Sequence, residues 1–400
     1  MRGLDWRFFF VADLQTGFGP VIAVYLTAHG WTQADLGIAL GVGSAAAMLA
    51  QVPAGALVDA LRSKATASAI ALVGICASAG LMAWSPAFWW VVLAQSIHGL
   101  ASCMLGPALA ALTLALVSRA AVAERLGRNA RFAAIGTAVG AMLMGACGTW
   151  VSTQAVFWLA ALLCVPSVLA LLSLARRITI PTAAETAGSV VVREAIRRVL
   201  LERRLATYLG CTVLFHLANA AMLPLAGVEI TKRANTEASL IIAACILVPQ
   251  FIVALVSPLA GRSAQRWGRR WVLLVGFSAL PLRAGLLAMV ADPLWIIPVQ
   301  ALDGLSGAAF GVITPLVVAD ISGRGGRFSL RIGILGLAIA AAATVSNTVA
   351  GAIASTLGTP TAFIAMGFAG VCAVTMVGFA MPETRSLTGS TGEAGDATAA

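Results

Sequence analysis

Long apolar runs separated by short polar turns recur along nearly the whole chain. A helix needs about 20 apolar residues to cross the hydrocarbon core of a bilayer, and twelve runs are of that order. Strands of a membrane barrel would instead alternate apolar and polar residues over about ten positions. The pattern therefore predicts an all-α integral membrane protein with twelve transmembrane helices, at residues 8–28, 36–58, 65–84, 87–117, 132–151, 154–174, 207–228, 238–260, 271–291, 294–319, 332–353 and 361–381.

Composition agrees with this assignment, because 60% of the residues are hydrophobic, 10% are charged and the mean hydropathy is +0.94. The net charge of +10 would also suit a nucleic-acid partner, but the basic residues follow the membrane instead. With the N-terminus inside, every Lys and Arg except Lys232, Arg233 and Arg283 falls in a predicted cytoplasmic segment. The positive-inside rule therefore predicts two cytoplasmic termini, and we expect the lipid bilayer, not nucleic acid, as a partner.

Residue patterns for bound groups are missing from the sequence. The seven cysteines lie in predicted spans without a C-x-x-C spacing, so neither a disulfide framework nor a zinc site is indicated. The nucleotide-binding pattern G-x-x-x-x-G-K does not occur, and no nucleophile triad can be named. We expect no metal, no cofactor and no enzymatic activity.

A basic segment divides the twelve spans into two sets of six. It carries seven arginines between Arg176 and Arg204, and its second part has apolar residues at the spacing of an amphipathic helix. We predict an N-terminal six-helix bundle at 1–175, a basic cytoplasmic linker at 176–206, a C-terminal six-helix bundle at 207–382 and a disordered cytoplasmic tail at 383–400.

The two sets of spans also look like copies of one another. Gln95 and Gly99 in the fourth span recur as Gln300 and Gly304 in the tenth, at an offset of 205. The loop segments 55–64 and 261–270 each follow the second span of a set, at an offset of 206. Landmarks with nearly one offset predict two pseudo-symmetric bundles, as in transporter folds built from repeats.

Twelve spans, inside termini, a basic central loop and these two loop segments resemble the major facilitator superfamily of secondary transporters, over residues 1–382. The loop signature of that family reads approximately G-x-L-x-D-R-x-G-R-R/K. The first copy keeps Gly55, Leu57, Asp59 and Lys64, with Ala60, Arg62 and Ser63 at other signature positions. The second copy keeps Gly261, Arg266, Gly268, Arg269 and Arg270, with Gln265 in place of the acid.

The resemblance implies that these loops act as gates, in which an acid near a helix end pairs with arginines or a helix N-terminus in one conformation and releases them in another. Asp59 is then the gating acid. Ordinary topogenic charges are the alternative. The gating residues that we expect are Gly55, Asp59, Arg62, Lys64, Gly261, Arg266, Gly268, Arg269 and Arg270.

Polar groups inside spans are costly, on the order of 3 kcal/mol for an ionised side chain at the midplane, so each is a functional candidate. Gln95 and His98 share one helix face, as do Gln300 and Asp303. The resemblance implies that the first, fourth, seventh and tenth spans line a central cavity. We predict proton coupling by Asp13, His98 and Asp303, and a substrate cavity formed by Gln15, Gln95, His216, Asn219, Arg283, Gln300 and Asn347.

Two of these predictions have open alternatives. His98 is either a proton carrier or a buried neutral imidazole bonded to a neighbouring group. Arg283 and Asp303 each lie about ten residues from the turn near Asp292, hence at similar depth, and could form a static ion pair. Alternatively, Arg283 binds an anionic substrate or releases Asp303 during the cycle.

The expected function is secondary active transport by alternating access, with proton-coupled efflux of a small organic molecule or drug. Proton-coupled uptake of an organic anion is one alternative, and a non-transporting sensor or scaffold on the same fold is another. The fifth span, with Gly136 and Gly140, resembles the glycine-rich helix of drug and proton antiporters but lacks their Gly-Pro pair. We expect a monomer in the inner membrane of a bacterial-type cell.

Overall fold

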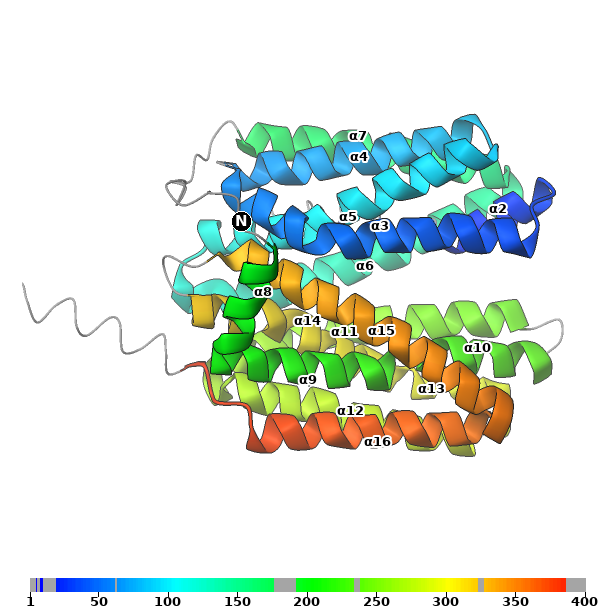
Figure 1. The fold of residues 1–400 in the computed structure, drawn as a ribbon. Coiled ribbons are helices and arrows are strands. Elements are labelled where there is room, and N and C mark those ends of the chain that lie inside the picture. Colours follow the sequence, from blue (N-terminus) through cyan, green and yellow to red (C-terminus); the bar gives the residue numbers. More distant parts are fainter. Residues whose placement is uncertain are drawn as a thin grey trace, which may run out of the picture. The chain divides into compact units, whose positions relative to one another are not determined.

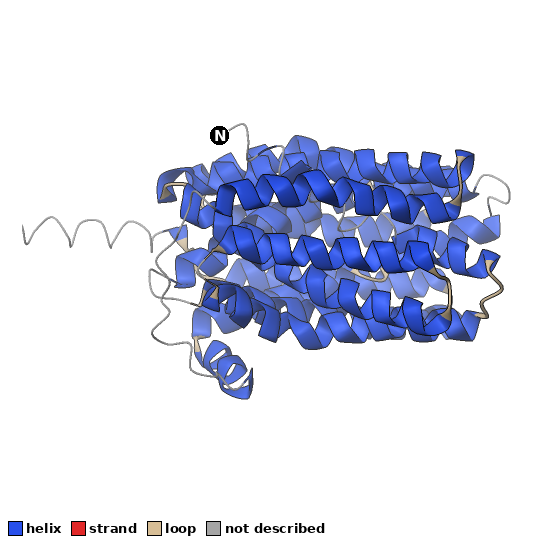
Figure 2. Cartoon of the chain, turned by 90° about the horizontal axis from the view of Figure 1, so that it is seen from above, coloured by secondary structure: helices blue, strands red, loops and turns tan. Residues whose placement is uncertain are grey.

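The computed structural model describes residues 5, 8, 9, 19–61, 63–175, 192–233, 238–322 and 327–385. Across these ranges the regular structure is helical and contains no strand (Figure 2). Ten of the helical segments in this part of the chain are long and apolar enough to cross a membrane. Of the first predicted span, residues 8, 9 and 19–28 are described, and all of them are helical. The sixth corresponds to helix α7 (Thr153–Ala175). The predicted all-α membrane fold is confirmed.

Most of the described helices are separated from the next one by only a few residues (Figure 1). Those of the first half are α2 (Gly19–Ala28), α3 (Gln33–Ala60), α4 (Lys64–Trp84), α5 (Phe88–Leu116), η1 (Arg119–Ala121), α6 (Val122–Trp150) and α7. Those of the second half are α8 (Val192–Leu201), α9 (Arg203–Asn219), α10 (Met222–Arg233), α11 (Ala238–Trp267), α12 (Arg269–Met289), η4 (Pro293–Trp295), α13 (Ile296–Val299), α14 (Ala301–Ser322), α15 (Phe328–Leu357) and α16 (Thr359–Phe379).

Large apolar side chains are found both in the packed core and on the outside of the helices. Tyr25 and Phe157 are fully buried, whereas the helical residues Phe251 and Phe368 are 70% and 71% exposed. A helix that is apolar on all sides is typical of a membrane span, because lipid tails accept the outward-facing residues. The exposed apolar surface therefore belongs to the membrane assignment.

Contacts group the chain into two units that do not coincide with the two sequence halves. The described residues of 1–118, 132–192 and 325–337 form unit 1, and those of 119–131, 193–324 and 338–400 form unit 2. The first turns of α6 thus group with unit 2 and the first turns of α15 with unit 1. The bundle, linker and tail boundaries inferred from the sequence stay predictions.

Equivalent helices pack in the same pairs in the two units. In unit 1, α3 packs against α5, α5 against α4, and α4 against α7; in unit 2, α11 packs against α14, α14 against α12, and α12 against α16. A Cβ added at Gly99 would lie 2.5 Å from the carbonyl oxygen of Gly43, and one at Gly304 would lie 2.6 Å from that of Pro249. These glycines are related by the offset found in the sequence, so the same close helix crossing occurs twice.

Candidate functional site

Arg283 of α12 is the centre of a polar cluster in unit 2. Its side chain is 1% exposed. One terminal nitrogen donates hydrogen bonds to Oδ1 of Asn219 and to Oδ1 of Asp303, both at 2.6 Å, and the other donates to Oε1 of Gln300, also at 2.6 Å. Two helices, α9 and α14, and the residue between α13 and α14 therefore supply the acceptors. Four residues of the predicted cavity and proton-coupling sets are brought together, and the ion pair of Arg283 and Asp303, one of the two alternatives left open by the sequence, is present.

The cluster lies deep in the membrane-spanning part of the chain, because Asn219 is near the middle of the apolar segment Arg203–Arg233. A buried charge at such a depth must be paired and hydrogen-bonded. Arg283 meets this requirement through one carboxylate and two neutral amide oxygens. The pair is electrically neutral, and the two amides fix the orientation of the guanidinium.

The two charged groups differ in accessibility. The side chain of Asp303 is 23% exposed, compared with 1% for Arg283. Oδ1 of Asp303 accepts from Arg283, and Oδ2 accepts no hydrogen bond from any described residue. Nε of Arg283 and Nε2 of Gln300 are buried without a partner among the described residues. The charge that another molecule can reach in this conformation is the carboxylate.

An aromatic group adjoins the cluster on the same two helices, α9 and α14. His216 lies one turn before Asn219, and its ring centroid is 5.0 Å from that of Phe310, in a T-shaped arrangement. Phe215 stacks on Phe310 at 4.7 Å. Nδ1 of His216 is 2.9 Å from the carbonyl oxygen of Thr212. His216, predicted as a cavity residue, is therefore part of an aromatic cluster next to the ion pair.

Other predicted residues belong to unit 1, do not bond to this cluster, or are outside the described residues. Gln95 is buried and His98 partly buried on α5 in unit 1. Asn347 is exposed on α15, and its amide donates to the carbonyl oxygen of Ala343 in its own helix. Asn347 therefore does not join the Arg283 cluster. Asp13, Gln15 and Arg62 are outside the residues that the structure describes.

In unit 1, the first loop copy binds the N-terminus of α15. Oδ1 of Asp59 accepts the backbone N–H of Ser329 at 3.0 Å, and Oδ2 accepts that of Leu330 at 2.9 Å. The first N–H groups of a helix have no partner within the helix and attract negative charge. Lys64 donates to the carbonyl oxygens of Val58, Asp59 and Leu61 and so closes the C-terminal end of α3. The predicted gating acid is thus a helix cap in this conformation.

In unit 2, the second loop copy makes the corresponding contact with the start of α6, but with different chemistry. Nε2 of Gln265 donates to the carbonyl oxygen of Ala120 at 2.6 Å, and Arg262 pairs with Glu124 at 3.3 Å on an exposed surface. A Cβ at Gly261 would overlap the backbone at Ala123. The copy without the acid therefore contacts a carbonyl group instead of free N–H groups.

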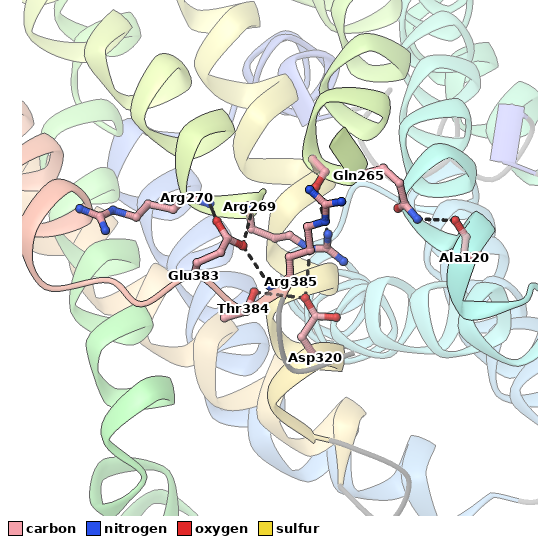
Figure 3. A network of polar contacts seen from close by, with 9 residues as sticks. Ala120, Gln265, Arg269, Arg270, Asp320, Glu383, Thr384 and Arg385 are labelled. Carbon is pink, nitrogen blue, oxygen red and sulfur yellow. Dashed lines mark hydrogen bonds and ion pairs between the residues drawn. The ribbon is translucent and has the colours of Figure 1, made fainter. Parts of the chain in front are cut away.

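A charged network that the sequence did not reveal holds the N-terminal end of α12 (Figure 3). The carboxylate of Glu383 accepts the backbone N–H groups of Arg269 and Arg270, at 2.9 and 3.1 Å. Arg269, one of the predicted gating residues, is 5% exposed and pairs with Asp320 at 3.0 Å. Gly268 precedes them at φ +102°, where a side chain would overlap the Glu383 carboxylate. The sequence predicted a disordered tail from residue 383, whereas Glu383 caps a helix.

Removing the Glu383 cap should destabilise the protein. Glu383→Ala leaves two N–H groups at the start of α12 without an acceptor, and we expect a loss of about 1–2 kcal/mol, read as a lower melting temperature in detergent. Glu194→Ala is the matched control, because the pair that Glu194 forms with Arg197, at 3.9 Å, is exposed and long. A melting temperature for Glu383→Ala equal to that of the control would show that the cap contributes nothing.

Comparisons with known proteins agree with the architecture. A sequence profile of the Major Facilitator Superfamily matches residues 8–248 and 208–399. Two Mycobacterium tuberculosis sequences, from different strains and each named an uncharacterized MFS-type transporter, are 34% identical over 389 residues, covering 96% of this chain and 93% of their own length. The crystal structure of the human organic anion transporter MFSD10 (TETRAN) is similar in fold, with a TM-score of 0.74, 18% identity and coverage of 94% and 99%. The chain therefore belongs to the major facilitator superfamily and is a multi-pass membrane transporter of the secondary type.

Proposed function

We propose that the protein exports a small organic molecule in exchange for protons, by alternating access, and that Asp303 carries the proton. The observation that supports this most is the partly exposed carboxylate of Asp303 beside the buried Arg283. An acid at this depth is costly unless it is paired or protonated. Asp303 can be paired with Arg283 or protonated. A group that exchanges a proton for substrate needs both of these states.

The neighbouring amides support a change of protonation at Asp303. When Asp303 takes up a proton, Asn219 and Gln300 still accept hydrogen bonds from both terminal nitrogens of Arg283. The guanidinium then keeps its position while the carboxylate loses its charge. The two amides therefore keep the guanidinium in place in either protonation state of Asp303.

The inner loops supply the switching contacts in this proposal. Asp59 holds the first turn of α15 through two backbone N–H groups, and these bonds must break for the helix end to move away. A ligand shifts such an equilibrium only through different affinities for the two conformations. His98, the second predicted proton carrier, would act in the first half. We further propose cytoplasmic termini, a monomer and an inner-membrane location.

Uptake of an organic anion is the rival that the geometry disfavours. The human protein of similar fold is named an organic anion transporter, and Arg283 is the residue that would bind an anion. Its side chain is 1% exposed and both terminal nitrogens are already hydrogen-bonded. An anion would have to displace these acceptors before it could bind.

Coupling and direction can be tested before the substrate is known. Inside-out membrane vesicles that contain the protein are acidified inside by respiration, and a pH-sensitive dye reports lumenal protons during a screen of organic cations, anions and neutral drugs. An exported compound should release protons from the lumen with the wild type and not with Asp303→Asn. Asp292→Asn, a cap in the loop before η4, is the control and should behave like the wild type. Full proton release with Asp303→Asn would contradict the proposal.

His98→Ala tests the second titratable position separately. We expect it to reduce gradient-driven export at least tenfold while the protein still inserts and folds, because its partly buried imidazole lies on the predicted cavity-lining span. The measurement is the same vesicle assay, normalised to the amount of protein. Ser96→Ala on the same helix is the control, because its hydroxyl bonds only to its own helix at Val92. Export by His98→Ala with the wild-type rate and pH profile would remove His98 from the proton path.

A further inference from the structure

We infer that the substrate is an organic cation with an aromatic group, bound by the free oxygen of Asp303 and by the rings of Phe310 and His216. The inference deepens the proposed function and rests on it for the direction of transport. The binding site itself is inferred only from contacts among α9, α12 and α14.

The accessible charge of the ion pair is the negative one. Arg283 is enclosed by oxygens from three residues, whereas Asp303 is 23% exposed and has one carboxylate oxygen that accepts no hydrogen bond among the described residues. A cation can pair with that oxygen without displacing Arg283. An anion would meet the carboxylate first and be repelled. The reachable face of the pair is therefore negative, although the pair as a whole is neutral.

Two partly exposed rings, those of Phe310 and His216, lie on the same helices as the polar cluster. Phe310 lies seven residues after Asp303, which places both on one face of α14, two turns apart. His216 lies three residues before Asn219 on α9, and its ring contacts Phe310 at 5.0 Å. Both rings are partly exposed, whereas Phe215 and Phe277 behind them are 3% and 0% exposed. The accessible surface next to the carboxylate is therefore aromatic.

These two features together define a class of ligand. A cation is attracted to a carboxylate and also to the face of an aromatic ring, and both attractions strengthen when water is excluded. The backbone positions of Asp303 and Phe310 are about 10 Å apart along α14. That separation suits a flat or bulky organic cation of drug size better than a metal ion or a simple amine.

The test compares two ions of nearly the same shape and opposite charge. Tetraphenylphosphonium is an aromatic cation, and tetraphenylborate is its anionic counterpart. Binding of each to the purified protein in lipid nanodiscs is measured with radiolabelled ion, and the amount taken up by protein-free nanodiscs is subtracted. We expect saturable binding of the cation and at least tenfold weaker binding of the anion. Tighter binding of the anion would overturn the inference.

Variants locate the binding site. Asp303→Asn should weaken binding of the cation at least tenfold, and Phe310→Leu should weaken it about fivefold. The double variant Arg283→Met/Asp303→Asn removes the carboxylate without leaving an unpaired charge, so it tests the same point if the single variant does not fold. Asp292→Asn and Phe368→Leu, at an exposed loop and an exposed helix position, are the matched controls. Unchanged binding in Asp303→Asn or in the double variant would refute the assignment.

The binding test and the vesicle test can fail independently of each other. If the vesicles exchange protons only for anionic or neutral compounds and the cation does not bind, the inference fails and proton-coupled export stands. If the cation binds through Asp303 but no compound releases protons, the binding site stands and proton coupling fails.

Discussion

Asp303→Ala should destabilise the protein by about 3–5 kcal/mol, because it leaves Arg283 charged and buried without a counter-ion. Arg283→Met should cost less, since Asp303 is 23% exposed and can be hydrated or protonated. The double variant should recover most of the stability, because apolar replacement of a whole buried pair is often neutral. Transport, in contrast, should be lost in all three variants, as each lacks a group that the cycle requires.

The measurements are melting temperatures in detergent, combined in a double-mutant cycle, and proton release in vesicles. Arg262→Met and Glu124→Ala, alone and together, form the control cycle, because this pair is more than 60% exposed on both sides and should couple weakly. A double variant no more stable than Asp303→Ala would show that the buried pair is not the reason for the loss. Recovered transport in the double variant would make the pair purely structural.

The second large effect is expected at Gly55 and Gly261, the glycines of the helix crossings next to the two loop copies. A Cβ at Gly55 would overlap the carbonyl oxygen of Ser329, and one at Gly261 would overlap that of Ala123. Backbone atoms cannot be moved aside as a flexible side chain can. Gly55→Ala and Gly261→Ala should therefore each cost about 1–3 kcal/mol and reduce transport at least tenfold.

Gly41→Ala is the control for the first crossing, because Gly41 is on the same helix as Gly55 and a Cβ there meets nothing within 4 Å. It should be neutral or slightly stabilising, since alanine is the better helix former. The comparison is made on melting temperature and on export in vesicles. If Gly55→Ala resembles Gly41→Ala in both, the close crossing is not needed for folding or for switching.

The helical fold could be predicted from the sequence, because a membrane span is encoded by a continuous apolar run and needs no knowledge of its neighbours. The repeat offset also held in three dimensions. Gly55 and Gly261 lie at equivalent helix crossings. On the partner helices, a Cβ at Gly333 would overlap the backbone at Gln51, and one at Gly127 would overlap the backbone at Ser257. Local pattern and internal repetition were sufficient for this level.

The candidate site could be predicted only in part. The pairing of Arg283 with Asp303 was one of two alternatives that their equal distance to one turn left open. The acceptors Asn219 and Gln300 depend on how three helices pack. Asn347 stays a predicted cavity residue outside this cluster, and its amide bonds to its own helix. Glu383 was missed because a carboxylate that caps a distant helix has no local sequence pattern.

The proposed transport cycle depends most on proton exchange at Asp303. The most direct measurement places purified protein in liposomes at zero membrane potential, set by valinomycin and equal potassium, and follows tetraphenylphosphonium in the presence of a pH gradient. We expect the wild type to accumulate the cation in acid-inside liposomes above the level of protein-free liposomes, and Asp303→Asn not to do so. Equal accumulation by Asp303→Asn, or accumulation only in acid-outside liposomes, would contradict the account.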